Sequence, residues 1–174
     1  MQSKCKIEQR PHRYTVAVRF RSAVAQLPER FAAAYDAVTR YLSENHTKPS
    51  GPAFAVYHAM SPDEIDVEAG FPVPHPLPGS GKVRPGELPG GRCATIVYTG
   101  PYRTIGIAYD ELSAWVEAQG LHAIGAPCEF YLNDPSSTRP EQLQTQLVIP
   151  IDDSQGSRVV IRASESTLEL VTSD

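Results

Sequence analysis

The stretch GPAFAVY at residues 51–57 can be laid on the stretch APCEFY at residues 126–131, so that Tyr57 falls opposite Tyr131. The match is short, but the residue patterns around both stretches predict the same succession of a strand, a helix and a hairpin. Because the local match and the element order agree, they indicate a duplicated βαββ unit. The sequence therefore predicts an α+β fold built from two tandem repeats.

The first repeat, residues 12–70, begins with a β-branched and aromatic run at residues 14–20 that is typical of a strand. From Pro28 onward, apolar residues recur at spacings of four and three, which predicts a helix that ends near residues 45–46. The apolar stripe of this helix consists of Phe31, Tyr35, Val38 and Leu42. Two strand-like segments separated by a turn then predict a hairpin over residues 53–69.

The second repeat, residues 92–151, shows the same order. An apolar helix face over residues 105–116 is preceded by Thr104 as a candidate N-cap and followed by Gly120 as a candidate C-cap. Two repeats side by side would form an antiparallel sheet with a pseudo-twofold axis and both helices on one face. The strands predicted in this half span residues 93–98, 128–132 and 143–151.

Three segments lie outside the repeats. Residues 1–11 form an N-terminal extension. Residues 71–91 contain six prolines and five glycines, so we expect no regular element there and interpret the segment as a lid, a linker or an insertion. Residues 152–174 form a C-terminal extension with two strand-like pieces, which predicts an extra hairpin or strands that cross to a partner chain.

The composition narrows the class of function. The chain has 174 residues and a formal net charge of −4, without the basic excess typical of nucleic-acid binders. No apolar run is long enough to span a membrane, and the N-terminal residues lack the apolar core of a signal peptide. Cys5, Cys93 and Cys128 show no CxxC spacing, which favours a reducing, cytoplasmic location. The histidine spacings suggest no metal site, and we expect no cofactor.

Glu129 is the most informative residue. Alternation along its strand places Glu129 and Tyr131 on one face and Cys128 on the other. The equivalent position of the first repeat holds Ala55, so the symmetry of the two halves is broken by a carboxylate. A buried carboxylate must be paired, hydrogen-bonded or protonated, and an apolar pocket would raise its pKa. The alternative interpretation is a solvent-facing glutamate on a half-exposed strand.

Aromatic residues gather on the same elements, and an aromatic cage beside a carboxylate is a good receptor for a flat or quaternary cation. Ordinary core packing is the alternative, above all for the helix-face Trp115. The ligand-binding candidates are Glu129, Tyr131, Tyr57, Tyr102, Tyr98 and Trp115.

The second repeat resembles the GyrI-like family, which also supplies the effector-binding domains of AraC-type and MerR-type regulators. The resemblance covers residues 12–151 and is carried by residues 99–102, 108–115, 129–135 and 147–151. It implies two βαββ units with a pocket at their seam for hydrophobic, cationic, aromatic compounds. It also implies that Glu129 is the acidic residue of that pocket and that Tyr131 is its companion.

Three functions remain open. The first is a small-molecule binding protein for hydrophobic cations. The second, implied by the resemblance, is a hydrolase of cyclopropane-bearing natural products. Glu129 would act as general base on a water or stabilise a developing charge, and Tyr131 or Tyr102 would donate a hydrogen bond. The third is a protein-docking domain like the gyrase inhibitor, and a homodimer is also open. Because no helix-turn-helix pattern precedes residue 12, we expect no direct DNA binding.

Overall fold

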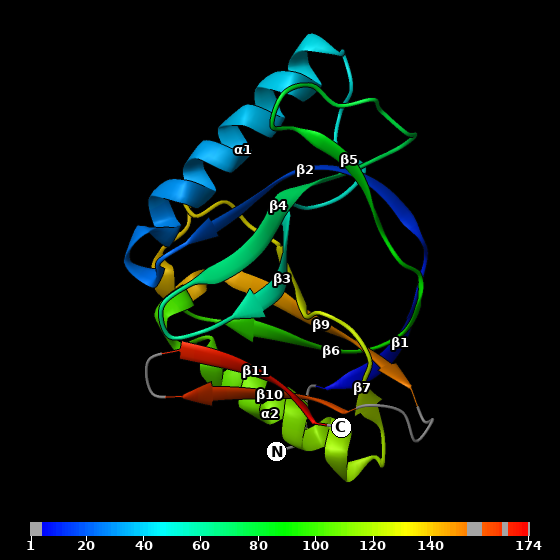
Figure 1. The fold of residues 1–174 in the computed structure, drawn as a ribbon, viewed down its shortest axis with the longest axis vertical. Coiled ribbons are helices and arrows are strands. Elements are labelled where there is room, and N and C mark those ends of the chain that lie inside the picture. Colours follow the sequence, from blue (N-terminus) through cyan, green and yellow to red (C-terminus); the bar gives the residue numbers. More distant parts are fainter. Residues whose placement is uncertain (1–4, 153–157, 165–166, 174) are drawn as a thin grey trace.

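The computed structural model describes residues 5–152, 158–164 and 167–173 (Figure 1). The α-helices are α1 (Leu27–Glu44) and α2 (Gly106–Ala118), and short 3-10 helices occur at η1 (Val24–Gln26), η2 (Tyr102–Thr104) and η3 (Pro140–Gln142). The strands are β1 (Lys6–Arg10), β2 (Arg13–Ser22), β3 (Phe54–Met60), β4 (Ile65–Val73), β5 (Arg84–Leu88), β6 (Gly91–Thr99), β7 (His122–Ala123), β8 (Cys128–Tyr131), β9 (Gln144–Asp152), β10 (Arg158–Ser164) and β11 (Thr167–Ser173).

The strands β1 to β9 form one curled antiparallel sheet. Its order is β1-β6-β9-β8-β3-β4-β2-β5, and β7 pairs with β9. The curl gives the sheet an outer face, which both helices cover, and an opposite, inner face (Figure 1). The sequence-based prediction of an α+β fold with both helices on one face of an antiparallel sheet is therefore confirmed.

The two repeats meet at the pairing of β3 with β8 in the middle of the sheet. Ala55 of β3 lies directly opposite Glu129 of β8. These two residues also occupied equivalent positions when the repeats were aligned, so the pseudo-twofold axis passes close to them. Glu129 therefore stands at the seam of the two halves, where residues from both repeats reach it.

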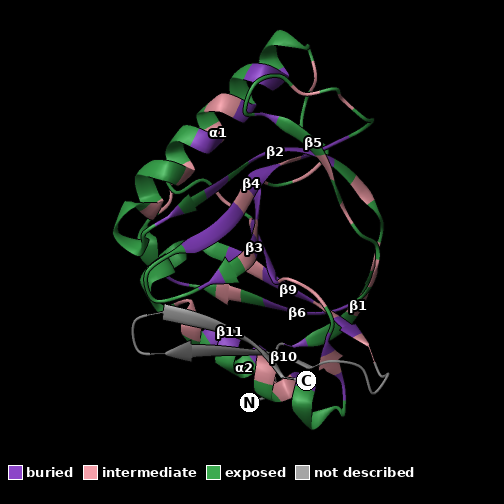
Figure 2. Ribbon diagram, in the orientation of Figure 1, coloured by how far each residue is buried: buried purple, intermediate pink, exposed green. Residues whose placement is uncertain are grey.

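Each repeat forms its own core between its helix and the outer face. The apolar stripe of α1, including Val38 and Leu42, packs on β2, β3 and β4. The stripe of α2, including Tyr109 and Leu112, packs on β6 and β9. Figure 2 shows that the central strands are largely buried, while the outward sides of both helices are exposed. A third cluster, on the inner face, consists of Ala17, Phe54, Cys93, Cys128, Phe130 and Val148.

The β1–β2 link and the β5–β6 link run side by side, between the β1–β6 pairing and the β2–β5 pairing. A Cβ atom on Gly90, in the β5–β6 link, would lie 2.7 Å from the backbone nitrogen of His12 and 2.9 Å from the carbonyl oxygen of Arg10. A side chain at Gly90 would therefore push apart the backbones of the two links.

The expectation that residues 71–91 hold no regular element was wrong, and residues 1–11 hold a strand that the sequence did not predict. Residues 84–88 form β5, which pairs with β2, although this segment was expected to hold no regular element. Pro85 is tolerated there because β5 is an edge strand whose outer side needs no amide donor. Lys6–Arg10, assigned to an N-terminal extension, forms β1 and pairs with β6.

The sequence predicted a capping residue at each end of α2. Thr104 does not cap α2, whose N-cap is Ile105; its hydroxyl contacts the Tyr98 hydroxyl and the Pro101 carbonyl instead. Gly120 has a φ of 71° just after α2, as expected of a helix terminator.

In the C-terminal extension, β10 and β11 pair as an antiparallel hairpin, and β10 lies against α2. No helix in the described part of the chain has the length and apolar character needed to cross a membrane.

Candidate functional site

Glu129 lies on the outer face of the sheet, beneath the helices. It is only 3% exposed, because α2 and the central strands cover it. Strand alternation explains this orientation: the neighbours Cys128 and Phe130 belong to the inner-face cluster, so Glu129 must point toward the helices. The prediction that the strand orients Glu129 away from Cys128 agrees with the structure, and the solvent-facing alternative does not.

Three tyrosine hydroxyls donate hydrogen bonds to the Glu129 carboxylate. Tyr109 of α2 donates to Oε1 at 2.8 Å. Tyr131 of β8 donates to Oε2 at 2.7 Å, and Tyr57 of β3 donates to the same oxygen at 3.3 Å. The three donors come from a helix and two strands, so the site exists only when both repeats are folded together.

Burial dominates the electrostatics of this cluster. Loss of water raises the pKa of Glu129 above its ordinary value, and the hydrogen bonds from Tyr131, Tyr109 and Tyr57 offset part of that effect. The pKa values of the same three tyrosines lie well above the usual value, first because of burial and then because of the nearby Glu129 charge. At neutral pH the tyrosines are therefore neutral donors, and the only titrating group of the cluster is the carboxyl.

A fourth and a fifth tyrosine surround this cluster. Tyr35 of α1 donates to the Phe54 carbonyl oxygen at 2.8 Å, and its ring meets the Tyr131 ring edge-on at 6.4 Å. The ring of Tyr102, in η2, also meets the Tyr131 ring edge-on, with 5.7 Å between centroids, and Tyr102 is 39% exposed. The aromatic side chains thus lead from the surface at Tyr102, past Tyr131, to the buried carboxylate.

The sequence-predicted residues separate into two groups. Tyr131 and Tyr57 both donate hydrogen bonds to Glu129, and the Tyr102 ring lies against the Tyr131 ring. Tyr98 is placed elsewhere: its hydroxyl contacts Thr104 Oγ1 at 2.6 Å and donates to the Pro101 carbonyl oxygen. Trp115 packs half-buried against the core beneath α2, which favours the core-packing alternative for this residue.

Tyr109 of the cluster and the neighbouring Tyr35 were not among the predicted site residues. Both lie on the apolar stripes of their helices, where aromatic side chains usually pack in a core. The signal that could have singled them out is the phenolic oxygen, because a fully buried tyrosine hydroxyl needs a hydrogen-bond partner. Tyr109 has no exposed surface, and the Glu129 carboxylate is that partner.

Among the described residues, no group of three or more His, Cys, Asp or Glu side chains is arranged to hold a metal ion. The site is instead a single carboxylate in an aromatic environment. Such an arrangement can compensate a positive charge on an organic ligand, or hold and release one proton.

The family model described as a GyrI-like small molecule binding domain matches residues 3–152. The chain belongs to the GyrI-like family. Its role as a small-molecule binding domain follows from this membership, and the matched residues span both repeats and β1. The comparison with curated proteins found no match.

Solved structures share the GyrI-like fold at low sequence identity. The EcmrR C-terminal domain superposes with a TM-score of 0.77 at 18% identity, covering 88% of this chain and all of that domain. In the cryo-EM EcmrR–DNA complex the TM-score is 0.76 at 18% identity, and the match covers 86% of this chain but only 57% of the EcmrR chain. SAV2435, solved bound to tetraphenylphosphonium, has a TM-score of 0.63 at 11% identity over 86% of this chain and 94% of its own.

Proposed function

We propose that this protein binds hydrophobic organic cations, with Glu129 supplying the negative charge and the surrounding tyrosines supplying flat walls. The observation that carries the proposal is the environment of the carboxylate. It is buried, and its hydrogen-bond partners are the neutral hydroxyls of Tyr57, Tyr109 and Tyr131. In the described part of the chain, no Lys, Arg or His side chain forms an ion pair with it.

A buried carboxylate without a cationic partner is costly, and hydrogen bonds from neutral donors offset only part of that cost. The raised pKa of Glu129 expresses this cost. A ligand cation placed near the carboxylate would compensate the charge, and the tyrosine rings would add stacking and cation–π contacts. The exposed Tyr102 marks the side from which such a ligand would approach.

The comparison with SAV2435 supports the choice of ligand class. That protein shares the fold and was solved with tetraphenylphosphonium, a lipophilic cation. At 11% identity the likeness concerns the fold, so the assignment of the charge to Glu129 rests on this chain's own geometry.

The proposal predicts a definite dependence on pH. The binding-competent form is the carboxylate, and the pKa of Glu129 in the free protein is raised. Affinity for a permanent cation should therefore increase as pH rises toward that pKa and level off above it. Each pKa unit between the free and the bound protein corresponds to about 1.4 kcal/mol of binding free energy.

Isothermal titration calorimetry with tetraphenylphosphonium tests the proposal on the wild type, on Glu129→Gln and on the control Glu117→Gln. Glu117 lies exposed on α2, so its replacement changes the net charge equally without touching the site. We expect Glu129→Gln to weaken binding at least tenfold, about 1.4 kcal/mol, and Glu117→Gln to leave it unchanged. Equal binding by all three proteins, or a pH-independent wild type, would refute the assignment.

The hydrolase and protein-docking alternatives stay predictions. The same Glu129 carboxyl, with its raised pKa, has the character of a general base. Tyr131 donates its hydroxyl hydrogen to this carboxylate and, in a hydrolase, would turn it to the substrate. Mass spectrometry of a cyclopropane-bearing compound incubated with the protein separates hydrolysis from binding. A gain of 18 mass units, lost in Glu129→Gln, would favour the hydrolase.

A further inference from the structure

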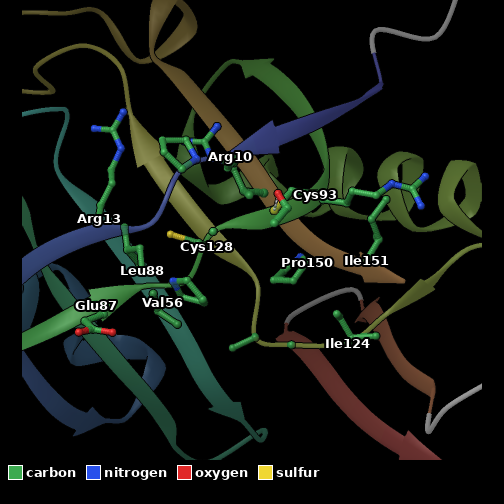
Figure 3. Close-up of a pocket in the computed structure, with 18 of the residues that line it drawn as sticks. Arg10, Arg13, Val56, Glu87, Leu88, Cys93, Ile124, Cys128, Pro150 and Ile151 are labelled. Carbon is green, nitrogen blue, oxygen red and sulfur yellow. Dashed lines mark hydrogen bonds between the residues drawn. The ribbon is translucent and has the colours of Figure 1, made fainter. Parts of the chain in front are cut away.

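The inner face of the sheet holds a cavity on the side opposite Glu129. Its volume is about 390 Å³, within the size range of small-molecule sites. The cavity lies within the curl, and its lining comes from both repeats. In Figure 3, Val56 and Cys128 lie between Leu88 on one side and Pro150 on the other.

This cavity is separated from the Glu129 cluster by the thickness of the sheet. Cys128 and Phe130 of β8 line the cavity, whereas Glu129 and Tyr131 of the same strand point to the outer face. A ligand in the inner cavity would therefore touch neither the carboxylate nor its tyrosine donors. The two sites are chemically independent, and the inference does not rest on the proposed function.

The charged group best placed in the cavity is Arg10. Its guanidinium lies over the Phe130 ring, 4.7 Å from the ring centroid, and the side chain is only 19% exposed. Its hydrogen bonds to Glu8 and Gln146, at 3.2 and 3.4 Å, both use Nη1. Glu8 is shared with Lys6 at 2.6 Å, so this carboxylate is divided between two cations. Two cations thus share one carboxylate, so the group carries one net positive charge, and Arg10 places it beside the Phe130 ring.

The acidic residues that line the cavity have partners of their own. Glu68 contacts His58 at 2.9 Å, and Glu87 contacts His12 at 3.0 Å. The lining contains three arginines, Arg10, Arg13 and Arg92, against these two carboxylates. The charge of the lining is thus positive on balance, opposite to that of the outer site.

We propose that the inner cavity binds an amphipathic organic acid. Its carboxylate would pair with the Arg10 guanidinium, and its apolar body would lie along Val56, Cys128, Val148 and Phe130. Arginine suits this role because its planar fork presents several donors to a carboxylate while its face stays stacked on a ring. The protein would then carry two small-molecule sites of opposite charge preference on the two faces of one sheet.

The test uses calorimetric titration of the full chain with decanoate and, as a cation of equal chain length, decyltrimethylammonium. Four proteins are compared: the wild type, Arg10→Met, the control Arg40→Met and Glu129→Gln. Arg40 is exposed on α1, remote from the cavity lining. We expect saturable decanoate binding by the wild type, Arg40→Met and Glu129→Gln, and at least tenfold weaker binding by Arg10→Met.

A second measurement locates the ligand in the wild type and remains decisive if Arg10→Met does not fold. Cys93 and Cys128 line the cavity, whereas Cys5 is buried in the core beneath α2. Decanoate should slow alkylation of Cys93 and Cys128 by N-ethylmaleimide, measured by peptide mass spectrometry, more than that of Cys5. The proposal is overturned by absent decanoate binding, by loss of that binding in Glu129→Gln, by full affinity in a folded Arg10→Met, or by equal protection of all three cysteines.

Discussion

Replacing Tyr109 by phenylalanine should cost more stability than the same change at Tyr131 or Tyr57. The reason lies in how the two oxygens of Glu129 are shared among the donors. Oε1 accepts from Tyr109 at 2.8 Å, whereas Oε2 accepts from both Tyr131 at 2.7 Å and Tyr57 at 3.3 Å. Loss of the Tyr109 hydroxyl therefore removes the donor that serves Oε1, while Oε2 keeps one donor after either of the other changes.

The magnitudes follow from the bond lengths and from the charge on the acceptor. A hydrogen bond to a charged group contributes about 1.5–3 kcal/mol, and a neutral one about 1 kcal/mol. With Glu129 ionised, we expect losses of about 2.5 kcal/mol for Tyr109→Phe, about 1.5 for Tyr131→Phe and about 0.5 for the longer bond of Tyr57. With the carboxyl protonated, the loss for Tyr109→Phe should fall to about 1 kcal/mol.

The pH dependence has a definite sign. The folded-state pKa of Glu129 is raised, so the free energy of unfolding falls as pH increases from the unfolded pKa through the folded one. Removing a donor to the carboxylate raises the folded pKa further, because the charged form loses support. The decline in stability therefore extends to higher pH in Tyr109→Phe than in the wild type, and the difference between them is larger at pH 9 than at pH 5.

Urea unfolding followed by circular dichroism at pH 5 and pH 9 measures these differences. Tyr98→Phe is the matched control, because the Tyr98 hydroxyl bonds to Thr104 and Pro101 in a turn and not to Glu129. Its effect should be the same at both pH values. The reasoning fails if Tyr57→Phe costs as much as Tyr109→Phe, or if the Tyr109→Phe loss does not change between the two pH values.

Three further outcomes are expected, all measured as changes in the free energy of unfolding. Gly90→Ala should cost about 1–3 kcal/mol because its Cβ would press on backbone atoms of the β1–β2 link. Gly125→Ala, whose Cβ would meet only the Pro150 ring at 3.4 Å, should cost much less, and equal costs would contradict the close approach at Gly90. Thr95→Val should stabilise the folded protein by about 1 kcal/mol, because the Thr95 hydroxyl is buried without a hydrogen-bond partner among the described residues. A loss of stability would show that the hydroxyl does have a partner. Arg19→Met should destabilise the protein at pH 7 by about 1 kcal/mol, because Arg19 holds the pKa of Asp66 below its usual value through hydrogen bonds of 2.8 and 2.9 Å. This loss of stability should vanish as pH falls through the lowered pKa, and a loss that persists in acid would mean that packing, not charge, is responsible.

Part of the site could be predicted because strand alternation is a local property. It placed Glu129 on the face opposite Cys128, and the comparison with Ala55 showed that one repeat carries a carboxylate where the other is apolar. Tyr57 and Tyr131 followed from the same alignment. Tyr98 and Trp115 were chosen for residue type and position. In the structure the Tyr98 hydroxyl bonds to the turn after β6, and Trp115 packs against the core beneath α2.

The misplaced segments have physical explanations as well. The density of proline and glycine in residues 71–91 argued against any strand, yet β5 forms because an edge strand can accommodate Pro85. Lys6–Arg10 is polar and short, and nothing within it signals a strand. It is ordered as β1 by pairing with β6, about 85 residues further along the chain, a contact that local patterns do not reveal.

The amino-acid sequence by itself determined the two repeats, their helices, most of their strands and the face on which Glu129 stands, because periodicity and alternation act over a few residues. Only the tertiary structure decided that Tyr109, 20 residues before Glu129, and Tyr57, 72 residues before it, donate to the same carboxylate. It also decided that residues of both repeats, Arg10 among them, line a cavity on the inner face of the sheet. Both depend on how the two repeats pack across the β3–β8 seam, where burial removes water and leaves each polar group to find its partner within the protein.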